Sequence, residues 1–176
     1  MKFPSHSGTH IDFPKHFSDE GKTSNDYSAD FWIFNNPFLL YYKANKNEII
    51  DLNNLLHLIP SSTDFLIIKT GFHKCRNSVD YWKNNPGLDP ELAPRLKSTC
   101  PNLKVIGFDF ISISSFSNRE MGRIAHRKFL VENEILVIED MSLIEASNKI
   151  EKVYCFPLLI NGIDGCPVTV IGEIIE

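Results

Sequence analysis

A dense group of metal-ligating side chains lies in residues 5–16, Ser-His-Ser-Gly-Thr-His-Ile-Asp-Phe-Pro-Lys-His. Three of the six histidines of the chain and one aspartate fall in this segment: His6, His10, Asp12 and His16. Imidazole nitrogen and carboxylate oxygen are donors that Zn²⁺ or Mn²⁺ accepts at neutral pH, with no thiolate needed. The segment therefore predicts a site for a divalent ion, and metal-assisted hydrolysis is a chemistry that such a site supports.

The backbone of this segment must bend and extend to bring the donors together. Gly8 and Pro14 disfavour one continuous helix. If residues 10–12 are extended, the side chains of residues 10 and 12 face the same side, about 6.6 Å apart at ~3.3 Å per residue. Gly8 then lets the chain turn so that His6 joins them. The alternative is a polar loop whose histidines only form hydrogen bonds, because single histidines are commonly structural.

The rest of the chain predicts the elements that position these donors. Short apolar runs between turn-forming residues predict strands over residues 37–42, 64–69, 104–109, 135–138, 152–159 and 167–172. Apolar spacing and capping residues predict helices over residues 51–59, 89–97 and 117–130, and a capped helical turn over residues 140–146. This mixed order implies one α/β or α+β domain around a mixed sheet, which 176 residues suffice to build.

Composition limits the partners that we expect. The net charge is −4 and no run of Lys or Arg occurs, so neither nucleic acid nor an anionic membrane is an expected partner, and a small molecule is. No apolar segment has the length of a membrane span or of a signal core, which predicts a cytoplasmic protein. Four scattered cysteines predict free thiols, with Cys155 and Cys166 packed in the core.

The segment from His6 to Phe17 resembles, position for position, the pattern H-x-G-T-H-x-D-x-P-x-H-F of the cyclase-like metal-dependent hydrolases. That family includes bacterial kynurenine formamidase and isatin hydrolase. Further segments that resemble the family follow in order at residues 67–71, 105–112, 125–130, 138–141 and 164–168, so the resemblance spans nearly the whole chain. It implies a single domain with a mixed sheet or partly closed barrel flanked by helices, of the swivelling β/β/α kind.

The resemblance also implies a ligand set. In the formamidase branch, the positions that match His6, His10 and Asp12 hold one ion. Asp12 would bridge to a second ion held by His126 and Glu139, whereas members with a single ion keep it in the first cluster, often as Mn²⁺. From the residues alone, His126 on a basic helix and Glu139 directly after an apolar strand are each better explained as ordinary surface or capping residues.

The implied activity is hydrolysis of an amide bond other than a peptide bond, in a small molecule such as an aryl formamide or a cyclic amide. His16 matches the position of the proton donor and acceptor in the formamidase branch. Two alternatives remain, a catalytically silent metal-binding relative and a metal-dependent cyclase or dehydratase. The resemblance further implies a homodimer or larger homo-oligomer.

Two features depart from the family pattern. Only five residues precede His6, whereas family members carry a strand and a loop there that help to wall the pocket. We therefore expect residues 1–176 to form one domain that lacks this segment. The run from Ser112 to Gly122 also differs from that of a formamidase, which favours a different branch and a different substrate.

Three further sets of polar residues have simpler interpretations. His57 is expected to be a packed, hydrogen-bonded histidine in an apolar helix. His73 is expected to serve loop structure before substrate contact. Arg119 and Arg123 could bind a substrate carboxylate in a bidentate way, but a solvated helix face is the preferred interpretation.

Overall fold

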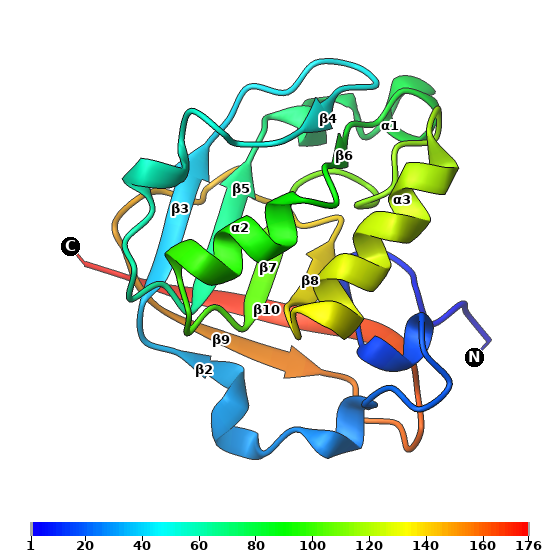
Figure 1. Cartoon of the computed structure of the whole chain (residues 1–176), viewed down its shortest axis with the longest axis vertical. Helices are drawn as coiled ribbons and strands as arrows, with labels where there is room; N and C mark the ends of the chain where they lie inside the picture. The colour runs from blue at the N-terminus through cyan, green and yellow to red at the C-terminus, as the bar shows by residue number, and fades with distance from the viewer. Residues whose placement is uncertain (1, 176) are drawn as a thin grey trace.

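One mixed sheet of eight strands, shown in Figure 1, organises the computed structural model, which describes residues 2–175. In spatial order its strands are β2 (Ile33–Phe34), β9 (Ile150–Pro157), β10 (Gly165–Ile174), β1 (His10–Asp12), β8 (Leu136–Glu139), β7 (Val105–Phe108), β5 (Phe65–Lys69) and β3 (Pro37–Tyr41). A separate two-stranded ribbon pairs β4 (Ile49–Ile50) with β6 (Gly87–Leu88). This architecture confirms the predicted single domain around a mixed sheet.

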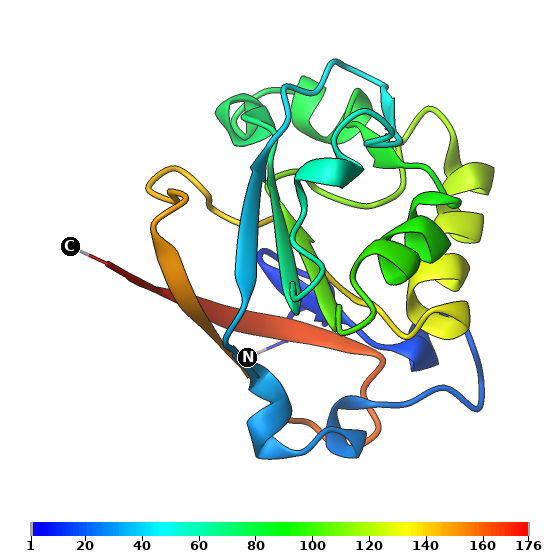
Figure 2. The same ribbon diagram turned by 60° about the vertical axis from the view of Figure 1, so that its left-hand side comes forward.

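The sheet has a parallel and an antiparallel part. Strands β3, β5, β7 and β8 run parallel to one another, whereas β1 lies antiparallel to both β8 and β10. The long hairpin of β9 and β10 crosses the parallel strands, and β9 also packs against β3, so that the sheet is nearly closed (Figure 2). The short strand β1 therefore joins the two parts of the sheet.

Helices cover one side of the parallel strands (Figure 1). They are α1 (Asp80–Lys83), α2 (Leu92–Thr99) and α3 (Arg119–His126), which continues as a π-helical turn over Arg127–Glu132. Short 3₁₀ turns occupy Pro14–His16, Ser24–Asp26, Ala29–Trp32, Leu56–Leu58 and Phe72–Cys75. No helix among residues 2–175 has the length and apolarity needed to cross a bilayer.

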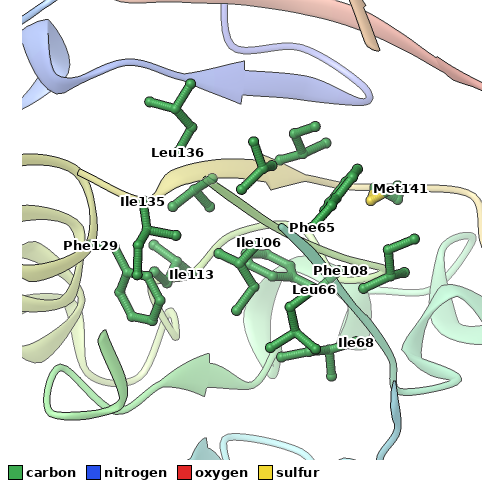
Figure 3. Close-up of a cluster of buried hydrophobic side chains, with 14 of the residues drawn as sticks. Phe65, Leu66, Ile68, Ile106, Phe108, Ile113, Phe129, Ile135, Leu136 and Met141 are labelled. Atoms are coloured by element: carbon green, nitrogen blue, oxygen red, sulfur yellow. The ribbon is translucent and has the colours of Figure 1, made fainter. Parts of the chain in front are cut away.

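The core lies between these helices and the sheet (Figure 3). Leu66, Ile106 and Phe108 from the parallel strands pack there with Phe129 from the π-helical turn, all fully buried, whereas Phe65 lies on the opposite face of the sheet, against Phe34. Strands β7 and β8 are buried along their whole length, and their sequences are accordingly continuous apolar runs up to Glu139. Cys155 and Cys166 are buried thiols without a disulfide, as predicted.

The strand predictions are confirmed, and so is the third helix, which begins at its N-cap Asn118. The helix expected from Asp89 begins at Leu92, because Pro90 and Glu91 form a turn closed by the bond from Leu92 N–H to the Asp89 carbonyl. The helix buries Leu92, Ala93 and Leu96.

Two predicted helical segments are wrong. In place of the helix predicted over residues 51–59, the structure has only the 3₁₀ turn Leu56–Leu58. Leu52 adopts a left-handed backbone with φ 54°, which a helix does not allow. The Asp51 carboxylate accepts the N–H of Asn53 instead of capping a helix. His57 is consequently exposed and not packed as predicted. Residues 140–146 contain no helix, because Asp140 has φ 57° and its carboxylate pairs with Arg76 at 2.7 Å.

Close packing of α3 explains the glycine in its middle. A Cβ atom added to Gly122 would lie 2.4 Å from the Ser114 Cβ and 2.7 Å from its Cα. Glycine is therefore required for α3, which carries His126, to approach the loop before it.

We expect Gly122→Ala to destabilise the protein by about 1–3 kcal/mol, the usual cost of overpacking, although alanine favours helices over glycine. Urea denaturation measures the change. Gly172→Ala is the matched control, because its Cβ would meet Ile150 at an ordinary 3.6 Å. A Gly122→Ala protein as stable as the parent chain would contradict the packing argument.

Candidate metal centre

Strand β1 places the side chains of His10 and Asp12, two of the predicted metal ligands, in one cavity. His10 and Asp12 are separated by Ile11, whose side chain is fully buried on the other face. The pairing of β1 with β8 places His10 directly opposite Glu139. His10 Nε2 lies 3.5 Å from Asp12 Oδ1 and 3.4 Å from Glu139 Oε2. The predicted extension of residues 10–12 is confirmed.

The end of α3 brings His126 to the same point. Its Nε2 lies 3.6 Å from Asp12 Oδ2 and 3.6 Å from Glu139 Oε1. Its Nδ1–H donates to the Gly122 carbonyl at 2.8 Å, just as the Nδ1–H of His10 donates to the Gly8 carbonyl at 2.8 Å. Both imidazoles therefore present Nε2 to the cavity, an arrangement typical of metal-binding histidines held by a backbone acceptor.

His6 and His16 close the other side of the cavity. His6 donates from Nδ1 to Asp12 Oδ1 at 2.8 Å, and the ring centroids of His6 and His16 are 4.2 Å apart. His16 lies in the 3₁₀ turn directly after β1 and donates from Nδ1 to Asp164 Oδ2 at 2.9 Å. The structure thus brings all six predicted residues to one cavity of about 460 Å³: His6, His10, Asp12, His16, His126 and Glu139.

The buried acidic and basic groups in this cavity shift one another's pKa values. Burial by itself lowers the pKa of His10, but the hydrogen bond and the charge of Glu139 outweigh burial and raise that pKa to about 9. The same balance, with Asp12 and Glu139 as partners, raises the pKa of His126 to about 10. Burial opposes ionisation of both carboxyl groups, yet the histidine partners hold the pKa of Asp12 and of Glu139 below their ordinary values.

The donors suit a divalent cation. Two sets of ligating atoms each lie within 4.8 Å of one another, His6 with Asp12 and His16, and His10 with Asp12 and Glu139. Asp12 belongs to both sets, which suits a carboxylate shared by two ions. The Nε2 atom of His6 is buried and has no hydrogen-bond partner among the described residues. A buried nitrogen lone pair of this kind is a ready metal donor.

Two functional positions were not assigned from the sequence. Asp164, in the turn before β10, contacts His16 and also lies 3.4 Å from His6 Nε2. Ser112 donates its hydroxyl to Glu139 Oε1 at 3.1 Å and thereby orients that carboxylate. Both residues lie in segments that resemble the family, and this resemblance could have indicated them. The local sequence, however, does not show which side chains they contact.

His73, like His57, lies outside the cavity. His73 donates from Nδ1 to the buried Asp109 at 2.6 Å, within the loop after β5. Asp109 also accepts the backbone N–H groups of Thr70 and Gly71. This network supports the predicted structural role of His73.

Known proteins are similar to this chain in sequence and in fold. The family model described as "Putative cyclase" matches residues 1–115. A kynurenine formamidase from Geobacillus thermodenitrificans is 29% identical over 164 residues, which are 93% of this chain and 74% of that protein. Cyclase-like protein 2 from Arabidopsis thaliana is 25% identical, and the match covers 96% of this chain but 62% of that protein. Isatin hydrolase A from Labrenzia aggregata superposes with a TM-score of 0.81 at 17% identity, covering 97% of this chain and 74% of that structure, which shows a shared fold.

We expect metal uptake to release protons. At pH of about 7.5 the metal-free protein holds His10 and His126 protonated, since their pKa values are raised to about 9 and about 10, and ligation requires neutral imidazoles. Zn²⁺ binding should therefore release roughly one to two protons per chain near neutral pH, and fewer as the pH rises through 9 to 10.

Calorimetric titrations of metal-free protein in buffers of different ionisation enthalpy measure this release and the number of ions bound. The control is Asp12→Ala, which should bind metal weakly. Metal binding whose heat does not depend on the buffer would contradict the protonation of His10 and His126 in the metal-free protein.

Proposed function

Because the chain belongs to the cyclase family, we propose that it is a metal-dependent hydrolase that cleaves a non-peptide amide bond in a small molecule, such as an aryl formamide or a cyclic amide. The observation that carries this proposal is His16, which stands at the edge of the cavity, paired with Asp164 and not with the two buried carboxylates. A site that only binds metal has no need of such an imidazole.

Six side chains divide the work in this proposal. His6, His10 and Asp12 would hold one ion, and Asp12, His126 and Glu139 would hold a second. Zn²⁺ and Mn²⁺ suit these nitrogen and oxygen donors. When bound, such an ion polarises a carbonyl group and lowers the pKa of a water molecule.

His16 moves the protons of the reaction. Its Nδ1–H is held by Asp164, so its Nε2 is the atom that exchanges a proton. In the first step Nε2 accepts a proton from the attacking water as oxygen bonds to the amide carbon. In the second step it returns that proton to the leaving nitrogen as the C–N bond breaks, which balances the reaction as one water consumed for one amide cleaved.

Other residues keep the donors in place. The Ile113 N–H and the Ser112 hydroxyl both donate to Glu139 Oε1, at 2.7 and 3.1 Å. A Cβ atom at Gly165 would lie 2.3 Å from the His6 ring, so glycine there leaves room for that ring. These contacts preorganise the cavity, as catalysis requires.

Two alternative functions use the same cavity. A catalytically silent relative would bind metal without turnover, and a cyclase or dehydratase would use the same ion and His16 to remove water. The pairing of His16 with Asp164 favours a proton-transferring enzyme over a silent one. The nature of the product distinguishes hydrolysis from dehydration.

We also propose a cytoplasmic homo-oligomer. The four cysteines are unpaired thiols, which suits a reducing compartment. Apolar side chains remain exposed around the β9–β10 hairpin, among them Leu159 at 62% and Ile174 at 58%, and such surfaces commonly mark contacts between subunits.

Metal-dependent amide hydrolysis is the direct test. We expect metal-free protein to be inactive, and protein reconstituted with Zn²⁺ or Mn²⁺ to hydrolyse at least one of formanilide, N-formylkynurenine and isatin, measured by chromatography of the products. Metal-loaded protein that hydrolyses none of them would favour the silent alternative, and a dehydrated or cyclised product would favour the cyclase.

Removal of His16 should separate turnover from metal binding. We expect His16→Ala to lower kcat by about 10²–10⁴-fold, the usual contribution of a general acid–base group, while elemental analysis still finds metal. Asp164→Asn should lower kcat less, because the imidazole remains but loses its charged partner. His57→Ala is the matched control, since that histidine is exposed and outside the cavity. Full activity in His16→Ala would remove this residue from the proposed role.

A further inference from the structure

A second cavity adjoins the metal centre. It has a volume of about 290 Å³, and its lining shares Ile111 and Ser112 with the cavity of the metal centre. Because Ser112 contacts Glu139 directly, a molecule in the second cavity lies next to the proposed ligands. A substrate long enough to fill both cavities would thus place one end beside them.

Two arginines line this second cavity without a carboxylate partner. Arg119 and Arg123 are four residues apart on α3, so they project from the same face of the helix. Neither forms a salt bridge with any described residue, and no acidic side chain of the described residues lines the cavity. A chain with a net charge of −4 therefore keeps two unneutralised guanidinium groups at this position.

Two aromatic rings wall the same cavity. Trp82 is 46% exposed and Phe116 is 43% exposed, although both are large apolar side chains. The Arg119 guanidinium lies over the Phe116 ring, 4.4 Å from its centroid, and this stacking limits the freedom of the arginine. The cavity therefore combines apolar walls with two cationic groups, of which Arg119 is already oriented.

The loop that carries Phe116 is held by a buried amide. Asn85, which is 1% exposed, donates from Nδ2 to the Ser114 carbonyl at 2.8 Å and accepts the Phe116 N–H at 3.1 Å. Arg123 lies one helical turn before His126 on α3. The spacing between the arginines and the metal centre is therefore set by one rigid helix and one fixed loop.

We propose that this second cavity is an anion-recognition subsite of the active centre, which selects aromatic amides that bear a carboxylate away from the scissile bond. The inference rests on the proposed function. The walls accept a planar ring, and guanidinium groups bind carboxylates through paired, charge-assisted hydrogen bonds. The competing interpretation of Arg119 and Arg123 as a merely solvated helix face predicts no preference for an anion.

Binding to metal-free protein tests the subsite without catalysis and without direct coordination of the carboxylate by a metal ion. The probes are 3- and 4-formamidobenzoate, with neutral formanilide as their comparison. Fluorescence of Trp82 reports occupancy, and Trp82→Phe identifies its signal against that of the buried Trp32. We expect at least one formamidobenzoate to bind about tenfold or more tightly than formanilide, as charge-assisted hydrogen bonds permit.

The arginines should carry this preference. In the double variant Arg119→Ala/Arg123→Ala the preference should fall to about twofold or less, whereas the single variant Arg123→Lys should keep part of it, because lysine keeps the charge but not the planar fork. Arg127→Ala is the matched control, since it removes an exposed arginine of the adjoining turn that does not line the cavity. Equal binding of formanilide and the formamidobenzoates by the parent protein, or a preference that survives the double variant, would overturn the proposal.

Kinetics of metal-loaded protein separate this inference from the proposed function. The preference should appear mainly in KM, so that the ratio of kcat/KM for formamidobenzoate over formanilide falls about tenfold in the double variant. Arginine-dependent binding without hydrolysis of any substrate would support the subsite and contradict the proposed function. Hydrolysis with no arginine-dependent preference would support the function and contradict the subsite.

Discussion

Two carboxylates buried side by side are the constraint on which the rest of the structure depends. Asp12 is 1% exposed and Glu139 is 4% exposed, and both end in the same cavity. Burial of an ionised carboxylate without a partner costs several kcal/mol, so positive charge must lie beside this pair. His10 and His126 supply it in the metal-free protein, and a divalent ion can take over that role. Protonated imidazoles and metal ions can thus each compensate the buried negative charge of Asp12 and Glu139, which is why the cavity suits a metal.

This constraint accounts for the position of β1. A strand of three residues adds little stability by its own pairing, yet it lies at the junction of the parallel and antiparallel parts of the sheet. There it faces Glu139 across one ladder and Gly165 across the other. Glycine in β10 leaves space for His6, and glycine in α3 lets His126 approach. The donors come from three separate parts of the chain, residues 6–16, His126 and Glu139, and these close approaches allow them to share one cavity.

Features of the fold and of the site that depend on local residue chemistry can be predicted from the sequence. The spacing of His6, His10 and Asp12 indicated a metal site, and the apolar runs located the strands correctly. Two helical segments were wrong because a single left-handed residue, Leu52 in one and Asp140 in the other, breaks the helical path, and apolar spacing does not report backbone φ. The partner of His16 was missed for another reason: Asp164 lies 148 residues away, and only the register of the folded sheet brings the two together.

The environments of the histidines also separate the proposed ligands from the proposed base. His10 and His126 are buried and each contacts both carboxylates, so a proton on either is held by the buried negative charge. His16 contacts neither carboxylate; its side chain is 30% exposed, and its partner Asp164 is 40% exposed. His16 is therefore open both to solvent and to a molecule in the cavity. Catalysis of hydrolysis requires a group that gains and loses a proton in each turnover, and among the histidines of this cavity the surroundings of His16 suit that requirement best.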